Sequence, residues 1–341
     1  MIVKMSRRTF VGSATAAGLV GVDCGIRHAF AQEAWPRLRF ANDVAYDHPF
    51  SVHIRAANKR ILNESGGVTD IRMFTDSRLG NDQIMLKDVR NGFIQLLALS
   101  PLALVQQVPV AAISAVGYAF PDYKAVWSAM DGALGALVRT AIEGLGLHVF
   151  EKMWDNGYHQ MTSGSHAITE PGDLKGFKLR APGHPMVGSI FKALGADPIA
   201  IDAGEVYGAL SDNKIDGEDG PLFDLASATL YEVQKYCSLT AHMWDGFWLV
   251  TNIASWKKTA PKTQEIITRN YNMAAVAYRT DLAALNATNT EQLTAKGMAF
   301  NKTDPKPFRE ALVKAGYYSD LKKKFDAKAW ATLEKYSGPL R

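Results

Sequence analysis

Histidine and cysteine are among the residue types in this 341-residue chain that could hold a metal ion or a metal cluster. The two cysteines are too few for a disulfide framework or a multi-cysteine metal site. The histidines beyond position 31 form neither H-E-x-x-H nor another tight metal spacing; they are His48, His53, His148, His159, His166, His184 and His242. We therefore expect no metal and no cofactor, although the sequence leaves a dispersed metal site open.

The motifs of common catalytic centres are also missing from the sequence. There is no G-x-G-x-x-G after a predicted strand, no G-x-x-x-x-G-K-[ST] phosphate loop and no G-x-S-x-G nucleophile turn. The acidic stretch over residues 216–220 lacks the alternating ligands and the distal Glu of an EF-hand calcium loop. We therefore predict that the protein is not an enzyme, and we keep an exported enzyme as the less favoured alternative.

The first 31 residues have the three parts of a secretory signal peptide. Arg7 and Arg8 stand in a Ser-Arg-Arg-x-Phe motif, an apolar segment covers residues 11–22, and Ala29-Phe30-Ala31 is an A-x-A cleavage site. The apolar segment is too short to span a bilayer, which takes about 20 residues. The paired arginines resemble the twin-arginine export motif, with an ordinary Sec signal as the alternative. We predict cleavage after Ala31 and a periplasmic location.

The excess of positive charge belongs mostly to this leader. The whole sequence has 38 Lys and Arg against 34 Asp and Glu, a formal net charge of +4. Without residues 1–31 the balance is 34 basic against 33 acidic residues. No run of Lys and Arg interleaved with aromatic residues remains, so we expect no nucleic-acid partner. The remaining cysteine, Cys237, is expected to be a small buried apolar residue.

Hydrophobic periodicity predicts alternating strands and helices along the rest of the chain. The first part is expected to form strand 37–42, helix 48–62, strand 68–74, helix 81–89 and strand 93–99. A helix over 121–143 and a strand over 147–154 follow. A second unit is expected to form strand 177–181, helix 186–194, strand 198–201, helix 205–211 and a short segment at 215–217. This alternation predicts an α/β fold with helices on the faces of a sheet.

Two predicted strands, 235–240 and 247–252, precede a very long helical segment over 261–295 that contains no internal Pro or Gly. Apolar residues recur along it every three or four positions, from Ile266 to Leu285. Such a helix is about 50 Å long at 1.5 Å per residue, more than one small domain covers. We therefore predict that it bridges two domains. Two shorter helices broken near 286–289 are the alternative, and short helices over 307–314 and 327–336 end the chain.

Five segments, taken in this order, resemble the periplasmic substrate-binding subunit of TRAP (tripartite ATP-independent periplasmic) transporters. They are SRLGND at 77–82, DNGYHQ at 155–160, DLKGFKLRAP at 173–182, EVYGAL at 205–210 and DGE at 216–218. The resemblance covers about residues 37–335. It implies a two-domain periplasmic binding protein-like fold with hinge strands and a long domain-bridging helix. The expected domains are 32–156 with 246–284, and 157–245 with 285–341, with the ligand cleft between them.

The resemblance also implies a function and partners. The family captures small organic acids, dicarboxylates among them, by closing its domains on the ligand, and delivers them to a membrane permease that uses an ion gradient. We expect the protein to act as a monomer, with a dimer as the alternative. A periplasmic binding protein of another class, serving an ABC transporter or a sensor, is the main alternative, and a long bridging helix would favour the TRAP class.

The resemblance assigns the main ligand contact to Arg180. In the family, the arginine of this motif pairs with the ligand carboxylate, and the planar guanidinium suits that role because it can make two parallel hydrogen bonds. His159 departs from the family pattern, which often has a second arginine there. A neutral histidine donates one hydrogen bond and accepts another, and it can gain charge near neutral pH. This difference mildly favours a monocarboxylate, or a hydroxy or keto acid.

The other expected ligand contacts rest on weaker positional arguments. They are Asp43 after the first strand, Asp82 at a helix start, Leu99 as an apolar wall, Glu218 and Asp219 in the acidic stretch, and Trp244 and Phe247 beside a hinge strand. Asp82 could instead serve the helix dipole, and Trp244 and Phe247 could instead be core residues.

Overall fold

The computed structural model describes residues 37–341, and the predicted signal peptide lies outside this range. The first part forms the strands and helices expected from the sequence. They are β1 (Leu38–Ala41), α1 (Pro49–Glu64), β2 (Ile71–Phe74), α2 (Asp82–Arg90) and β3 (Leu96–Leu99). Both β2 and β3 pair with β1 in parallel, so the carboxyl ends of β1 and β3 meet at one edge of the sheet.

A second parallel unit repeats this arrangement. It consists of β6 (Lys178–Ala181), α5 (Pro185–Ala193), β7 (Asp197–Ala200), α6 (Val206–Ser211), β8 (Gly217–Pro221) and α7 (Leu222–Ser227). Strand β6 pairs in parallel with β7 and with β8. We call the part built on β1–β3 the β1 half and the part built on β6–β8 the β6 half.

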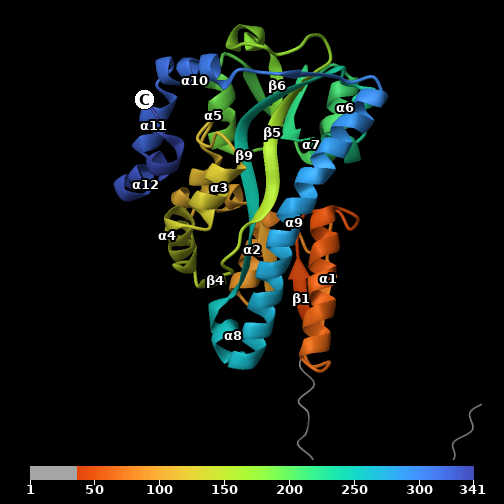
Figure 1. Cartoon of the computed structure of the whole chain (residues 1–341), viewed down its shortest axis with the longest axis vertical. Coiled ribbons are helices and arrows are strands. Elements are labelled where there is room, and N and C mark those ends of the chain that lie inside the picture. The colour runs from red at the N-terminus through yellow and green to blue at the C-terminus, as the bar shows by residue number, and fades with distance from the viewer. Residues whose placement is uncertain (1–36) are drawn as a thin grey trace, which may run out of the picture. The chain divides into compact units, whose positions relative to one another are not determined.

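Two long strands run from one half to the other (Figure 1). They belong to one continuous sheet of order β2-β1-β3-β9-β5-β8-β6-β7. They are β5 (Trp154–Ser163) and β9 (Tyr236–Asn252). The predicted break between strands 235–240 and 247–252 is wrong, because the polar residues between them are buried and β9 continues through them. The predicted strand 147–154 is instead β4 (Leu147–Val149) followed by the start of β5. The pairing of β5 with β9 has irregularities beside Gly157 and Gln160.

The helix predicted over 121–143 is also divided, into α3 (Tyr123–Met130) and α4 (Ala133–Glu143). Asp131 ends α3 and accepts two hydrogen bonds from Arg279, 2.8 and 3.0 Å long, so a contact distant in sequence fixes the break. A Cβ on Gly135 would lie 1.8 Å from the carbonyl oxygen of Met130, so only glycine fits this close approach.

Helix α9 (Pro261–Ala295) is continuous, which confirms the predicted long helix and shows that the alternative of two shorter helices is wrong. Its first part lies beside α1 (Figure 1) and buries Tyr271, Tyr278 and Leu282 in the core of the β1 half. Its last turns bury Leu293 in a separate core with Cys237 and residues of the β6 half. The helix therefore bridges the two halves, and Cys237 is buried as expected.

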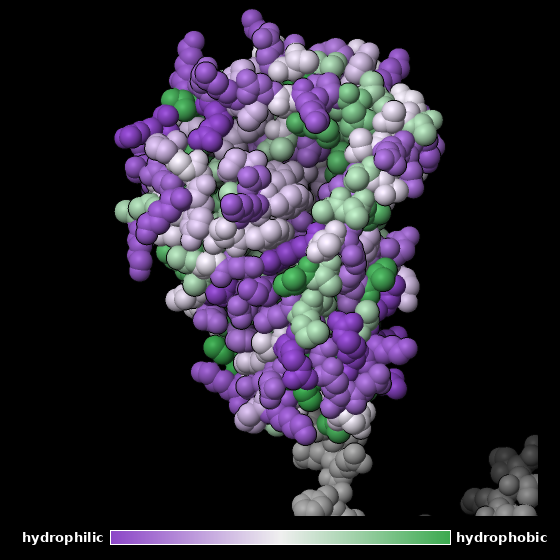
Figure 2. All heavy atoms as spheres, in the orientation of Figure 1, coloured by the Kyte–Doolittle hydropathy of each residue, from purple (hydrophilic) through white to green (hydrophobic). Residues whose placement is uncertain are grey.

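The remaining elements are α8 (Ile253–Lys258), β10 (Ala299–Lys302), α10 (Pro305–Lys314), α11 (Tyr317–Lys322) and α12 (Ala327–Ser337). Helices α10 and α11 pack on α5, whereas α12 packs on α3 and α4 of the β1 half. Charged and polar side chains cover most of the face in Figure 2. None of the helices over 37–341 is long and apolar enough to cross a membrane.

Candidate functional site

A cavity of about 420 Å³ lies between the two halves. The β1 half contributes the loop after β1, the start of α2 and the residue after β3, and the β6 half contributes β6, β8 and α7. The hinge strands β5 and β9 form part of the wall. The polar side chains that line the cavity are Asp43, Asp47, His48, Asp82, Ser100, Asn156, His159, Arg180, His184, Glu218, Asp219, Asp224, Ser227 and Asp245.

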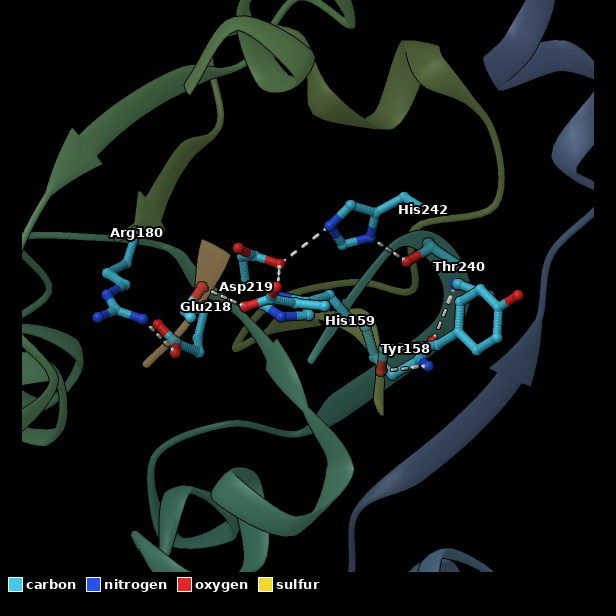
Figure 3. A network of polar contacts seen from close by, with 11 residues as sticks. Tyr158, His159, Arg180, Glu218, Asp219, Thr240 and His242 are labelled. Atoms are coloured by element: carbon cyan, nitrogen blue, oxygen red, sulfur yellow. Dashed lines mark hydrogen bonds and ion pairs between the residues drawn. The ribbon is translucent and has the colours of Figure 1, made fainter. Parts of the chain in front are cut away.

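Among the residues of 37–341 that line this cavity, Arg180 is the only lysine or arginine. It lies on β6 and is 9% exposed. Its Nε donates to the carbonyl of Ile201 at 2.9 Å, and its Nη1 donates to Oε1 of Glu218 at 3.0 Å (Figure 3). Within residues 37–341, Nη2 has no hydrogen-bond partner. One edge of the guanidinium is therefore held by the protein, and the other remains available to a ligand.

Burial of Glu218 changes the electrostatics of this ion pair. Burial raises the pKa of Glu218 to about 8, against the opposing charge of Arg180. Near neutral pH the glutamate is therefore mostly protonated, and it does not cancel the positive charge of Arg180. That charge remains available to an anionic ligand.

A buried network connects β5, β8 and β9 beside this pair (Figure 3). Asp219 Oδ1 lies 2.9 Å from His159 Nδ1 and 2.9 Å from His242 Nε2. His242 Nδ1 lies 2.8 Å from the Thr240 hydroxyl. Strands β5 and β8 contribute His159 and Asp219, and β9 contributes Thr240 and His242, so the network also fixes the position of β8 against the two hinge strands.

The network places positive charge on His159 rather than on His242. Burial alone would lower the pKa of His159, but the Asp219 carboxylate raises it above its usual value. Burial lowers the pKa of His242 despite its bond to the same carboxylate. The two histidines lower the pKa of Asp219, although burial of its carboxylate acts in the opposite direction. The Nε2 of His159 is buried with no partner in the described chain, and the residue lines the cavity.

Three further acidic side chains line the cavity outside the Asp219 network. Asp43 follows β1, Asp82 begins α2, and Asp245 lies on β9. Burial and the charges of Asp82, Asp224 and Asp245 raise the pKa of Asp43 to about 7. Burial also raises the pKa of Asp82, and it raises those of Asp224 and Asp245 to about 6. Ser100 Oγ donates to Asp245 Oδ2 at 2.8 Å, whereas Asp245 Oδ1 has no partner in the described chain.

Seven of the nine side chains expected from the sequence come together in this cavity: Arg180, His159, Asp43, Asp82, Glu218, Asp219 and Phe247. Leu99 and Trp244 are not among its lining residues. Leu99 is fully buried and is paired with Trp248 on β9. The Nε1 of Trp244 donates to Asp155 Oδ1 at 2.8 Å, so its polar edge is occupied within the protein.

Several other residues at the site were not predicted from the sequence. Asp224 and Asp245 line the cavity, and His242 bonds to Asp219. Asp245 and His242 lie in the stretch that periodicity assigned to a loop between two strands, and Asp224 begins no recognisable motif. Their role depends on pairing between β5, β8 and β9, which local sequence does not reveal. Over residues 37–341, no three His, Cys, Asp or Glu side chains are arranged to hold a metal ion.

Comparison with known proteins matches residues 40–319 to the bacterial extracellular solute-binding protein family 7, DctP. The chain is 31% identical over 230 residues to the 2,3-diketo-L-gulonate-binding periplasmic protein of Escherichia coli (strain K12), covering 67% of this chain and 70% of that protein. It is 30% identical over 239 residues to the C4-dicarboxylate-binding protein DctB of Bacillus subtilis (strain 168), covering 68% and 66%.

Solved structures show the same fold. A TRAP periplasmic solute-binding protein from Sulfitobacter sp. NAS-14.1, with bound β-D-galacturonate, superposes with a TM-score of 0.82 at 21% identity and covers 89% of this chain and 100% of its own. One from Polaromonas sp. JS666, bound to D-erythronate, has a TM-score of 0.80 at 25% identity, covering 87% and 97%. The fold and the central cavity thus define a two-domain solute-binding protein. The chain belongs to the bacterial extracellular solute-binding protein family 7.

Proposed function

We propose that this protein captures a small organic acid in the cavity between its halves and delivers it to a TRAP permease. The carboxylate binds at the open edge of the Arg180 guanidinium, and His159 Nε2 donates a second hydrogen bond. Capture closes the two halves by bending at β5 and β9. The limits expected for the two domains, at 156/157, 245/246 and 284/285, fall within these two strands and α9, which supports this motion.

The observation that carries the proposal is the half-satisfied guanidinium. Arg180 is buried, its Nε and Nη1 are positioned by Ile201 and Glu218, and Nη2 has no partner in the described chain. A charge-assisted hydrogen bond in such a site is stronger than an exposed ion pair, because little water competes for it. The relatives and neighbours that bind gulonate derivatives, galacturonate or erythronate support a carboxylate ligand.

Export and partners complete the proposal. Residues 1–31 act as a twin-arginine signal peptide, cleavage follows Ala31, and the mature protein works in the periplasm as a monomer. Membership in family 7 and the long bridging helix α9 favour a TRAP permease over an ABC transporter or a sensor as the partner. The protein acts in this account as a carrier without catalytic activity.

Calorimetric titration tests the proposal, using carboxylates chosen by a thermal-shift screen. A ligand at 100-fold excess over Kd stabilises the folded state by about 2.7 kcal/mol, which a thermal shift detects. Replacing Arg180 alone would leave Glu218 buried without a partner. The informative variant is therefore Arg180→Met combined with Glu218→Gln, which removes both charges and retains side-chain volume.

We expect the double variant to fold with a similar melting temperature and to lose carboxylate affinity by at least 100-fold. Glu218→Gln alone is the matched control, and it should retain binding because Arg180 keeps its charge. Unchanged affinity in the folded double variant would remove Arg180 from the ligand site. Absence of binding by any carboxylate to the wild-type protein would contradict the function itself.

A further inference from the structure

Acidic side chains outnumber basic ones in the cavity. The positive side chains are Arg180 on β6 and His159 on β5. We call Asp43, Asp82 and Asp245 the acidic wall; Asp224 on α7 also lines the cavity, and the charges of Asp224 and Asp245 act on His159. None of these four aspartates forms an ion pair with a Lys, Arg or His of residues 37–341. A ligand that contributed only negative charge would leave this wall uncompensated.

The acceptor oxygens on this wall also lack donors. Asp245 is 3% exposed and lines the cavity; its Oδ2 accepts from Ser100, but its Oδ1 is buried with no partner. Asp82 Oδ1 is likewise buried without a partner in the described chain. A buried carboxylate oxygen without a hydrogen bond is costly, so a bound ligand gains by supplying donors here. A dicarboxylate has only acceptors to offer.

Asp43 and Asp224 line the cavity but are exposed, so their carboxylates remain in contact with solvent in the unliganded protein. The negative charges of Asp82, Asp224 and Asp245 all act on Asp43. A neutral hydroxyl group on the ligand would donate to one carboxylate oxygen, but it would leave the repulsion between the aspartate charges in place. A positively charged donor group relieves both costs at once.

We propose that the ligand is a zwitterion, whose carboxylate binds Arg180 and His159 and whose ammonium group binds between Asp43, Asp82 and Asp245. The inference rests on the proposed function, since it assumes that a carboxylate lies at Arg180. An ammonium group has three donors in a compact charge, which matches several carboxylate oxygens converging from β1, α2 and β9. The positive and negative ends of the ligand then contact opposite halves, and binding holds the halves together.

The specificity follows from this arrangement. A dicarboxylate of the same length would place a second anion against Asp43, Asp82 and Asp245, so the acidic wall rejects it. A hydroxy acid would bind more weakly, because it supplies donors without charge. The acidic wall is therefore both the attractive element for amino acids and the repulsive element against dicarboxylates.

Matched ligand sets test the inference by calorimetry on the wild-type protein. Each set holds an amino acid, the corresponding hydroxy acid and the dicarboxylate of equal chain length. The amino acids are the linear ω-amino acids of three to six carbons and the common α-amino acids. We expect at least one amino acid to bind 30-fold or more tightly than both of its partners. The variants Asp43→Asn and Asp82→Asn should each weaken that amino acid at least 10-fold and change hydroxy-acid affinity less than threefold.

Three results would overturn the inference and leave the proposed function standing. They are hydroxy acids or dicarboxylates that bind as tightly as the amino acids, variants that weaken all ligands equally, and dicarboxylate binding that requires added Ca²⁺ and is abolished by a chelator. In the last case the positive charge at the acidic wall would come from a metal. Failure of every carboxylate in the sets to bind would contradict the proposed function instead.

Discussion

At the scale of single residues, the site is built from buried charges that are only partly satisfied by the protein. The protein holds Nε and Nη1 of the Arg180 guanidinium and leaves Nη2 open. The Asp219 carboxylate favours the protonated form of His159, whose Nε2 has no partner in the described chain. Buried polar groups without partners destabilise the unliganded protein. A ligand that supplies the missing hydrogen bonds removes this cost, and the difference adds to its affinity. When protonated beside Asp219, His159 carries the positive charge that an arginine at this position would carry at all pH values.

His48 gives the clearest pH dependence at this scale. It caps α1, because its Nδ1 accepts from the backbone N–H of Phe50 at 3.1 Å, and its ring lies edge-on against Phe223 at 4.3 Å. Burial lowers the pKa of His48 to about 4, with Asp47 opposing. The folded state therefore binds fewer protons than the unfolded state between about pH 6.5 and 4, and His48 removes stability as the pH falls through that window.

We predict that His48 costs about 3 kcal/mol of unfolding free energy between pH 7 and pH 4. The matched variant is His48→Asn, because asparagine also caps a helix but does not titrate. Urea unfolding at several pH values should show wild type losing stability relative to the variant as the pH falls. A stability difference independent of pH would mean that His48 is not held neutral in the folded protein.

At the scale of elements, the hinge strands position the site and α9 connects the halves. Strands β5 and β9 bring His159, Asp219 and His242 together, because β5 pairs with both β8 and β9. Helix α9 contributes to the core of each half and is anchored at its middle. There Arg279 pairs with Asp131 and lies over the Trp127 ring at 3.7 Å. Because it packs into both cores, α9 links the two halves.

The continuity of α9 can be tested at Ala287, which is exposed and lies where two shorter helices would have met. Ala287→Pro removes one backbone hydrogen bond and clashes with the preceding turn, so we expect a loss of about 3 kcal/mol in unfolding free energy. The control Ala287→Gly should cost only about 1 kcal/mol. Equal, small costs for both substitutions in urea unfolding would indicate that the helix is interrupted there.

At the scale of the whole molecule, the sequence predicted the fold better than it predicted the site. The alternating strands and helices and the continuous α9 could be read from hydrophobic periodicity, because these elements each bury one face along their length. The division of α3 from α4 could not, since it depends on Arg279 reaching Asp131 from 148 positions further along the chain. Where a contact between residues far apart in the sequence decides the end of a helix, the local hydrophobic pattern does not reveal that end.

The same distinction explains the site residues. Arg180, Glu218 and Asp219 lie in segments whose order carried the family resemblance, so they could be anticipated. Asp245 and His242 could not, because the polar stretch of β9 looks like a loop until its partners on β5 and β8 are known. The sequence therefore anticipated Asp43 and Asp82 of the acidic wall, whereas Asp245 was found only from the folded chain.

The central claim is that the halves close on a carboxylate held by Arg180, and a distance between the halves tests it most directly. Lys59→Cys on α1 and Lys192→Cys on α5 are exposed positions for a fluorescent donor and acceptor, Cys237 is buried, and Cys24→Ser removes the other cysteine. Single-molecule energy transfer should show one closed population that grows with ligand in the otherwise wild-type protein. It should stay at its ligand-free level when Arg180→Met and Glu218→Gln are added. A transfer efficiency that does not change at saturating ligand, or that changes equally in both proteins, would contradict the account.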